Sequence, residues 1–93
     1  LSGGGYAQYA KVHKDHLIEV PSDYNFEQAA AVTEVWATAF QILHVISNMT
    51  AEDTVLIHAA ASGVGSSMIQ LCKAAGAKSI AVAPKTLSWS SVK

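Results

Sequence analysis

The sequence predicts an α/β fold built around one strand-helix-strand unit between residues 54 and 83. Residues 54–58, Thr-Val-Leu-Ile-His, form a β-branched and aliphatic run that is too short for a helix. Such a run fits a strand that is buried on both faces of a parallel sheet. A turn of small residues and a helix that stops at Gly76 follow, and residues 79–83 again have the pattern of a buried strand. Two parallel strands joined by a helix make a βαβ unit, which is right-handed by default.

Within this unit, the helix from Val64 is expected to turn an apolar face toward the sheet. The residues predicted to face inward are Met68, Ile69, Cys72 and Ala75, and those predicted to face outward are Ser66, Ser67, Gln70 and Lys73. We interpret Cys72 as a small core residue, because a reactive thiol needs an electropositive and partly exposed setting.

Two helices are predicted before the unit. Asn25 and Gln28 have the spacing of a capping box, which predicts a short Ala-rich helix over residues 26–32. Thr33 and Glu34 begin a second helix, which ends near residues 47–48. Its apolar residues recur at three-to-four spacing: Val35, Trp36, Ala39, Phe40, Ile42, Leu43 and Ile46.

The N-terminal quarter of the chain carries weaker signals. Residues 6–12 alternate larger and smaller side chains, as a short strand does. A second short apolar stretch, residues 17–20, stops at Pro21.

Composition excludes several classes of protein. With 51% apolar and only 14% charged residues, the chain is too apolar for a disordered tail. The formal charge is −1 and the lysines form no basic stripe, so no nucleic-acid partner is expected. A single cysteine excludes an internal disulfide framework and a thiolate zinc cluster. No uninterrupted apolar run approaches about 18 residues, so no membrane span is expected.

The size of the chain and its apolar content together indicate whether it folds alone or as part of a larger molecule. A chain of 93 residues buries only about 60–65% of its unfolded surface, so this apolar content predicts surface that is meant for more protein. We therefore expect a fragment of a larger molecule.

The candidate site is the turn Ala60-Ala61-Ser62-Gly63-Val64-Gly65 between the first strand and its helix. A dinucleotide-binding turn needs small residues there, because its backbone turns sharply and approaches a pyrophosphate at the helix N-terminus. Against the G-x-G-x-x-G pattern, the first two glycine positions hold Ala60 and Ser62, and only Gly65 is retained. A tight turn without a ligand is about equally compatible with these residues alone.

The choice of nucleotide depends on the residues after the second strand. An NAD site usually carries Asp or Glu there, whereas this chain has Ala83, Pro84 and Lys85. With no carboxylate to repel a 2′-phosphate and Lys85 to pair with it, NADPH is favoured over NADH. The alternative is that Lys85 is a solvated loop residue.

Several blocks of sequence occur together in a familiar order. They are Gly4-Gly5-Tyr6-Ala7-Gln8-Tyr9, Gln28-Ala29-Ala30-Ala31, Trp36-Ala37-Thr38-Ala39-Phe40, Val55-Leu56-Ile57-His58, Ser62-Gly63-Val64-Gly65 and Gln70-Leu71. Over about residues 1 to 83, this order resembles the medium-chain dehydrogenases/reductases of the zinc-independent, zeta-crystallin-like quinone oxidoreductase branch. The tail after residue 84 matches that family less well.

The resemblance implies the end of a GroES-like catalytic domain over residues 1–33. A linking helix and the start of a Rossmann NADP-binding domain would occupy residues 34–93. Carried over by position, Ser62, Gly63, Val64 and Gly65 line the pyrophosphate and Thr38 faces the nicotinamide. The family implies NADPH as hydride donor, a quinone or other small electrophilic acceptor, and a homodimer of the full-length protein, with the cytoplasm as the default location.

The leading hypothesis is therefore an NADPH-dependent quinone reductase, present here as a fragment that is inactive alone. One alternative is an enoyl reductase of the same superfamily, and another is a truncated, non-catalytic product that acts through protein binding. No catalytic residue is identified, since hydride transfer needs no triad or paired carboxylates. The four histidines lack a metal-ligand motif, so no metal site is expected.

Overall fold

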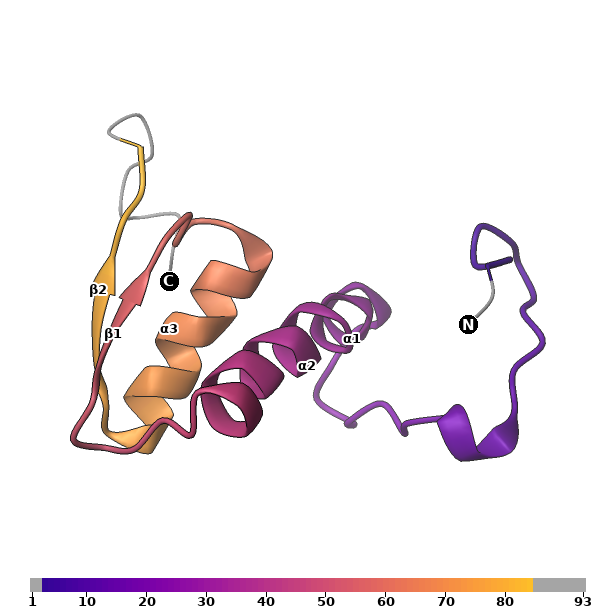
Figure 1. Cartoon of the computed structure of the whole chain (residues 1–93). Helices are drawn as coiled ribbons and strands as arrows, with labels where there is room; N and C mark the ends of the chain where they lie inside the picture. Colours follow the sequence, from indigo (N-terminus) through magenta and orange to yellow (C-terminus); the bar gives the residue numbers. More distant parts are fainter. Residues whose placement is uncertain (1–2, 85–93) are drawn as a thin grey trace.

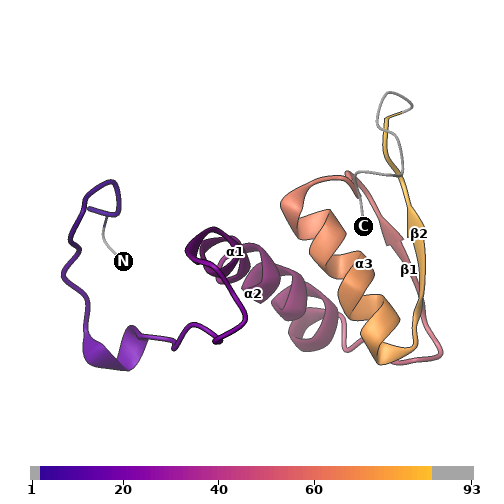
Figure 2. The same cartoon turned by 180° about the vertical axis from the view of Figure 1, so that it is seen from behind.

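The computed structural model describes residues 3–84, and its elements follow in sequence order (Figure 1). They are η1 (Lys14–His16), α1 (Phe26–Val32), α2 (Val35–Phe40), η2 (Gln41–Ile46), β1 (Thr54–Ile57), α3 (Gly63–Ala75) and β2 (Lys78–Ala81). Seen from either side, the extended N-terminal segment lies away from the βαβ unit, and the helices α1 and α2 lie between them (Figures 1 and 2).

The predicted βαβ unit is confirmed. β1 and β2 are parallel neighbours, with Leu56 opposite Ile80. The Lys78 amide donates to the Asp53 carbonyl at 3.1 Å, and the Val82 amide donates to the Ile57 carbonyl at 2.9 Å. Both strands end earlier than predicted, at Ile57 and Ala81.

The prediction that β1 is buried on both faces was wrong for the described residues. Ile57 is buried on the side that α3 covers, whereas Leu56 and Ile80 are each 55% exposed on the other face. Because a parallel sheet normally has both faces covered, this second face is left bare by residues 3–84.

Helix α3 begins at Gly63, one residue before its predicted start, ends at Gly76 as predicted, and has one unexpected buried residue. Ser62 is its N-cap, and Gly76 ends it in the left-handed conformation at φ 78°. Cys72 is buried, as predicted, in a core cluster with Leu43, Ile57 and Ala60. Ser67 is also buried, which contradicts its predicted outward orientation. Its hydroxyl donates to the Gly63 carbonyl at 2.8 Å, so burial leaves it satisfied.

The two predicted helices upstream are confirmed. At α1, the Gln28 amide donates to Asn25 Oδ1 at 2.8 Å and the Asn25 amide donates to Gln28 Oε1 at 3.0 Å, completing the capping box. The second helix begins at Val35 and changes to π-helical geometry at η2. It ends at Ile46, with Ser47 as its C-cap.

Fewer apolar residues of this second helix are buried than their three-to-four spacing predicted. Ala39 and Leu43 are buried, but Phe40 and Ile46 are exposed. The Phe40 ring instead lies against the His44 ring at an interplanar angle of 40°, with centroids 4.6 Å apart.

The strand predicted over residues 6–12 does not form. Tyr6 and Tyr9 are exposed, and within residues 3–84 this segment has no partner strand. An extended segment without a partner leaves its backbone groups to water and gains no ladder.

The helical stretch Phe26–Ile46 is long and apolar enough to cross a membrane by length and composition. An 18-residue window within it has a mean hydropathy of 1.4, and 11% of that window is buried. This is weak evidence, because core helices of soluble proteins pass the same test. The stretch also carries two glutamates, Glu27 and Glu34, which are costly in a bilayer.

Candidate functional site

The chain leaves β1 through a sharp turn that is held at both ends. Ala59 takes φ 50°, a left-handed conformation that alanine rarely adopts. The Ser62 amide donates to the Ala59 carbonyl at 2.9 Å, and the Ala60 amide donates to the Val82 carbonyl at 3.0 Å. The turn is thereby tied to the end of β2, and α3 begins beside the carboxyl ends of both strands.

Gly65 makes the closest backbone approach in this turn. A Cβ at Gly65 would lie 2.6 Å from the Ala59 carbonyl oxygen and 2.7 Å from the Ala60 Cα. Real Cβ atoms essentially never approach backbone so closely. The glycine retained from the dinucleotide pattern is therefore the one that packs the helix against the turn, a role that this position has in Rossmann folds.

The first turn of α3 contains backbone donors that have no hydrogen-bond partner among residues 3–84. Ser62 Oγ accepts a hydrogen bond from the Gly65 amide at 3.1 Å. The amides of Gly63 and Val64 make no hydrogen bond to any other residue between 3 and 84. Ser62 and Gly63 are themselves exposed. Free amides and the positive end of a 13-residue helix form a setting that attracts an anion.

These features fit the pyrophosphate of a dinucleotide. A side chain at Gly65 would clash with the turn backbone, the residues Ser62 and Gly63 are exposed to solvent, and the backbone donors lie at the helix N-terminus. Ser62, Gly63 and Val64 would hold the phosphates, and Gly65 would hold the helix in place.

Thr38 lies on α2, the helix that packs beside α3. Its side chain is exposed, and the Thr38 amide donates to the Glu34 carbonyl at 3.0 Å within the helix. The structure brings its helix against the candidate turn, because a Cβ on Gly63 would meet Val35 at 3.1 Å. Lys85, the residue predicted to pair with a 2′-phosphate, lies outside the described residues.

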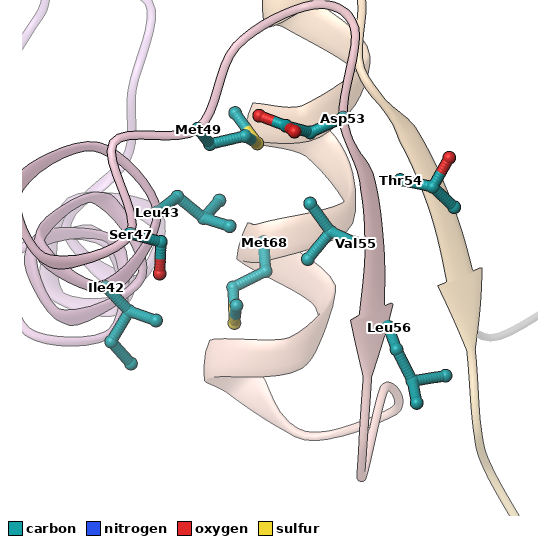
Figure 3. Close-up of a pocket in the computed structure, with 9 residues that line it drawn as sticks. All are labelled: Ile42, Leu43, Ser47, Met49, Asp53, Thr54, Val55, Leu56 and Met68. Atoms are coloured by element: carbon teal, nitrogen blue, oxygen red, sulfur yellow. The ribbon is translucent and has the colours of Figure 1, made fainter.

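A hollow of about 370 Å³ lies away from the candidate turn. It is bounded by η2, β1 and α3, on the side of β1 away from β2 (Figure 3). Val55 and Met68 point into it, whereas Leu56 points away (Figure 3). Ligands of open α/β sheets bind outside the carboxyl ends of the strands, whereas this hollow follows an unpaired strand edge. We therefore place the candidate site at the turn.

Cys72 has no part in the site. Its thiol donates to Met49 Sδ at 3.6 Å in the core, and burial raises the pKa of the Cys72 thiol above its ordinary value. Both features keep the sulfur protonated and unreactive at neutral pH. Among residues 3–84, no three His, Cys, Asp or Glu side chains come together as a metal site would require.

Sequence reasoning missed two parts of this geometry. The left-handed Ala59 has no signal, because alanine does not favour that conformation. The contact between Gly63 and Val35 joins residues 28 positions apart, and the only hint was the small size of residue 63.

Three comparisons with known proteins bear on the family of the chain. No family model matches the chain. The crystal structure of the CurK enoyl reductase is similar, with a TM-score of 0.72 and 33% identity, over 74% of this chain and 21% of that one. This structural similarity supports membership of the medium-chain dehydrogenase/reductase superfamily. The chain carries an incomplete part of the GroES-like and Rossmann architecture of that superfamily.

Polyketide synthases are similar in sequence. The squalestatin tetraketide synthase clz2 of Cochliobolus lunatus is 42% identical over 84% of the chain, and the highly reducing polyketide synthase tstA of Talaromyces stipitatus is 32% identical over 83%. Erythronolide synthase EryA2 of Saccharopolyspora erythraea is 39% identical over 89%. The chain spans only 2–3% of the length of these relatives.

The comparisons do not support the quinone oxidoreductase branch within the superfamily. The similar solved structure is an enoyl reductase and the relatives are polyketide synthases, so they favour the enoyl reductase alternative.

Proposed function

We propose that this chain forms part of the cofactor-binding region of an NADPH-dependent enoyl reductase within a polyketide-synthase-like polypeptide. The observation that carries the proposal is the glycine cradle at Gly65, present at the start of α3 in a chain that is 33% identical to an enoyl reductase of known structure. The substrate class would be an α,β-unsaturated acyl thioester.

The residues of the chain would act on the cofactor rather than on the substrate. Ser62 caps α3 through its bond to the Gly65 amide and leaves the Gly63 and Val64 amides free for phosphate oxygens. When bound at this turn, NADPH would supply a hydride for the β-carbon of the enoyl group, and the α-carbon would take a proton from solvent or a nearby group. Thr38, exposed on the neighbouring helix, would border the nicotinamide.

Preference for NADPH over NADH is part of the proposal. Ala83 and Pro84, which follow β2, are exposed and carry no charge that would repel a 2′-phosphate. Lys85 would pair with that phosphate. Replacement of Lys85 by Glu should then raise the KM for NADPH and leave the KM for NADH little changed.

The decisive experiment measures NADPH oxidation by the polypeptide that contains this chain. Crotonyl thioester and a benzoquinone are offered as alternative acceptors at equal concentration. We expect oxidation with the thioester and a saturated acyl product by mass spectrometry. Turnover with the quinone alone would overturn the proposal in favour of a quinone reductase.

The 93-residue chain by itself serves to test the non-catalytic alternative. The two parallel strands within residues 3–84 do not complete a dinucleotide-binding sheet, so we expect weak NADPH binding and no turnover. If the polypeptide that contains the chain also failed to bind NADPH in a fluorescence titration, the enzyme proposal would be overturned and a protein-binding role favoured.

A further inference from the structure

Val35 lies directly over the first turn of α3. A Cβ built on Gly63 would have three nearest neighbours, all of them atoms of the Val35 side chain: Cγ1 at 3.1 Å, Cβ at 3.7 Å and Cγ2 at 4.0 Å. The first distance is tighter than nine in ten real Cβ contacts. The absence of a side chain at Gly63 therefore allows α2 to approach the candidate turn this closely.

The contact continues along both helices. Val35, Ala39 and Leu43 are spaced by four residues and so share one stripe of the helix, and Ala39 and Leu43 are buried. On α3, the buried Ser67 lies one turn beyond Gly63 on the same face. The contact between Val35 and Gly63 is thus the end of a packed seam between the two helices, at the edge where the seam reaches solvent.

Two groups at the candidate site are fixed by this seam. Thr38 is exposed on α2, one turn from Val35, and the free amides of Gly63 and Val64 begin α3. Any change in the separation of α2 and α3 moves Thr38 relative to those amides. The separation at this end is set by the Val35 side chain, because it fills the space over Gly63.

We propose that Val35 is a positioning residue, whose contact with Gly63 sets the distance between α2 and the phosphate-binding turn and so the affinity for the dinucleotide. The inference rests on the proposed function in that NADPH is taken as the ligand. Val35 would act through Gly63 and not on the cofactor, so its effect belongs to cofactor binding and leaves the turnover of the saturated enzyme nearly unchanged.

A double-mutant cycle in the polypeptide that contains this chain tests the contact. Gly63→Ala adds the crowding methyl group without backbone strain, since Gly63 does not have a positive φ. We expect this variant to raise the KM for NADPH roughly tenfold, the effect of modest overpacking, with kcat within about twofold. Val35→Ala makes room for that methyl group. The double variant Val35→Ala, Gly63→Ala should therefore return the KM to within about threefold of the wild type.

The outcomes separate the possible roles. If the double variant binds NADPH as poorly as Gly63→Ala, the methyl group obstructs the phosphate directly and the role of Val35 is overturned. A KM unchanged in all three variants also overturns it. If the wild-type polypeptide binds no dinucleotide in a fluorescence titration, the proposed function itself fails, which is a different result.

Two further variants guard against loss of folding. Val35→Phe crowds the contact from the side of α2 and should raise the KM for NADPH even if Gly63→Ala does not fold. Val45→Ala is the matched control, since Val45 is an exposed valine on η2, beyond the seam. It should leave the KM and the melting temperature unchanged. A rise in the KM for NADPH in Val45→Ala as large as the rise in Val35→Phe would overturn the specific role of Val35.

Discussion

Gly65 and Ala60 are in such close backbone contact that a methyl group on Gly65 would lie 2.7 Å from the Ala60 Cα. Neither partner can move cheaply. Ala60 is buried and its amide is bonded to the Val82 carbonyl, and Gly65 is inside the first turn of α3. The helix N-terminus, and with it the free amides of Gly63 and Val64, is therefore placed by this contact.

The substitution Gly65→Ala should consequently have two effects: it should destabilise the βαβ unit, and it should abolish NADPH binding. The added methyl group must displace α3 from the turn, at a cost of about 3 kcal/mol in the free energy of unfolding. Urea unfolding and an NADPH fluorescence titration of the polypeptide that contains the chain measure the two effects.

The same substitution at the other end of α3 provides the control. Gly76→Ala places alanine at φ 78°, which costs about 1–2 kcal/mol through backbone strain, but its Cβ meets only Ala51 at an ordinary 3.6 Å. We expect lower stability with normal NADPH affinity. Equal loss of binding in both variants would mean that stability, and not the cradle, limits binding.

Ser62 combines a structural and an electrostatic role, and two substitutions separate them. Ser62→Ala removes the acceptor of the Gly65 amide and should cost about 1 kcal/mol of stability. Ser62→Asp retains an N-cap acceptor and so the stability, but it places a negative charge where the phosphates would lie. The aspartate variant should bind NADPH much more weakly than the alanine variant. The reverse order of affinity would argue against phosphate binding at this turn.

The sequence predicted those parts of the fold that depend on local chemistry. The capping box at Asn25 and Gln28 and the glycine stop at Gly76 are both confirmed, because each is decided within a few residues of chain. The βαβ unit follows from the contrast between a β-branched run and an amphipathic run.

The failures concern contacts made across the chain. Ser67 was predicted to face solvent from its polarity, but α2 covers that face of α3, and the hydroxyl is satisfied by the Gly63 carbonyl. The strand predicted over residues 6–12 has no partner within residues 3–84. At the site, the turn was predicted from the sequence, and the role of Thr38 stays a prediction. The domain boundary after residue 33, the homodimer and the cytoplasmic location also stay predictions.

Leu56 and Ile80 form an exposed apolar pair on the face of the sheet that residues 3–84 leave uncovered, in register with one another. In the 93-residue chain alone, replacing both by Thr should reduce aggregation, measured by light scattering, because it removes exposed apolar surface from strands that favour Thr.

In the longer polypeptide, the same double variant should instead be harmful, because it should lower the free energy of unfolding. If another layer covers this face, the two substitutions lose buried apolar area and lower the free energy of unfolding by roughly 3 kcal/mol. Unchanged stability in the longer polypeptide would show that the face stays exposed there.

Cys72 gives the chain a pH-dependent stability in the alkaline range. Burial raises the pKa of its thiol above the ordinary value of 9.0, so the folded state holds this proton more tightly than the unfolded state. The resulting stabilisation is fully present below pH 9 and is lost as the pH rises through the folded pKa.

Cys72→Ala removes the thiol and leaves a small cavity, so the variant should be less stable at pH 7. The stability gap between wild type and variant should then narrow as the pH rises above 9 and through the folded pKa, because only the wild type loses the contribution of the thiol. Urea midpoints of both proteins across this range test the effect, and a gap that stays constant would mean that the folded thiol titrates normally.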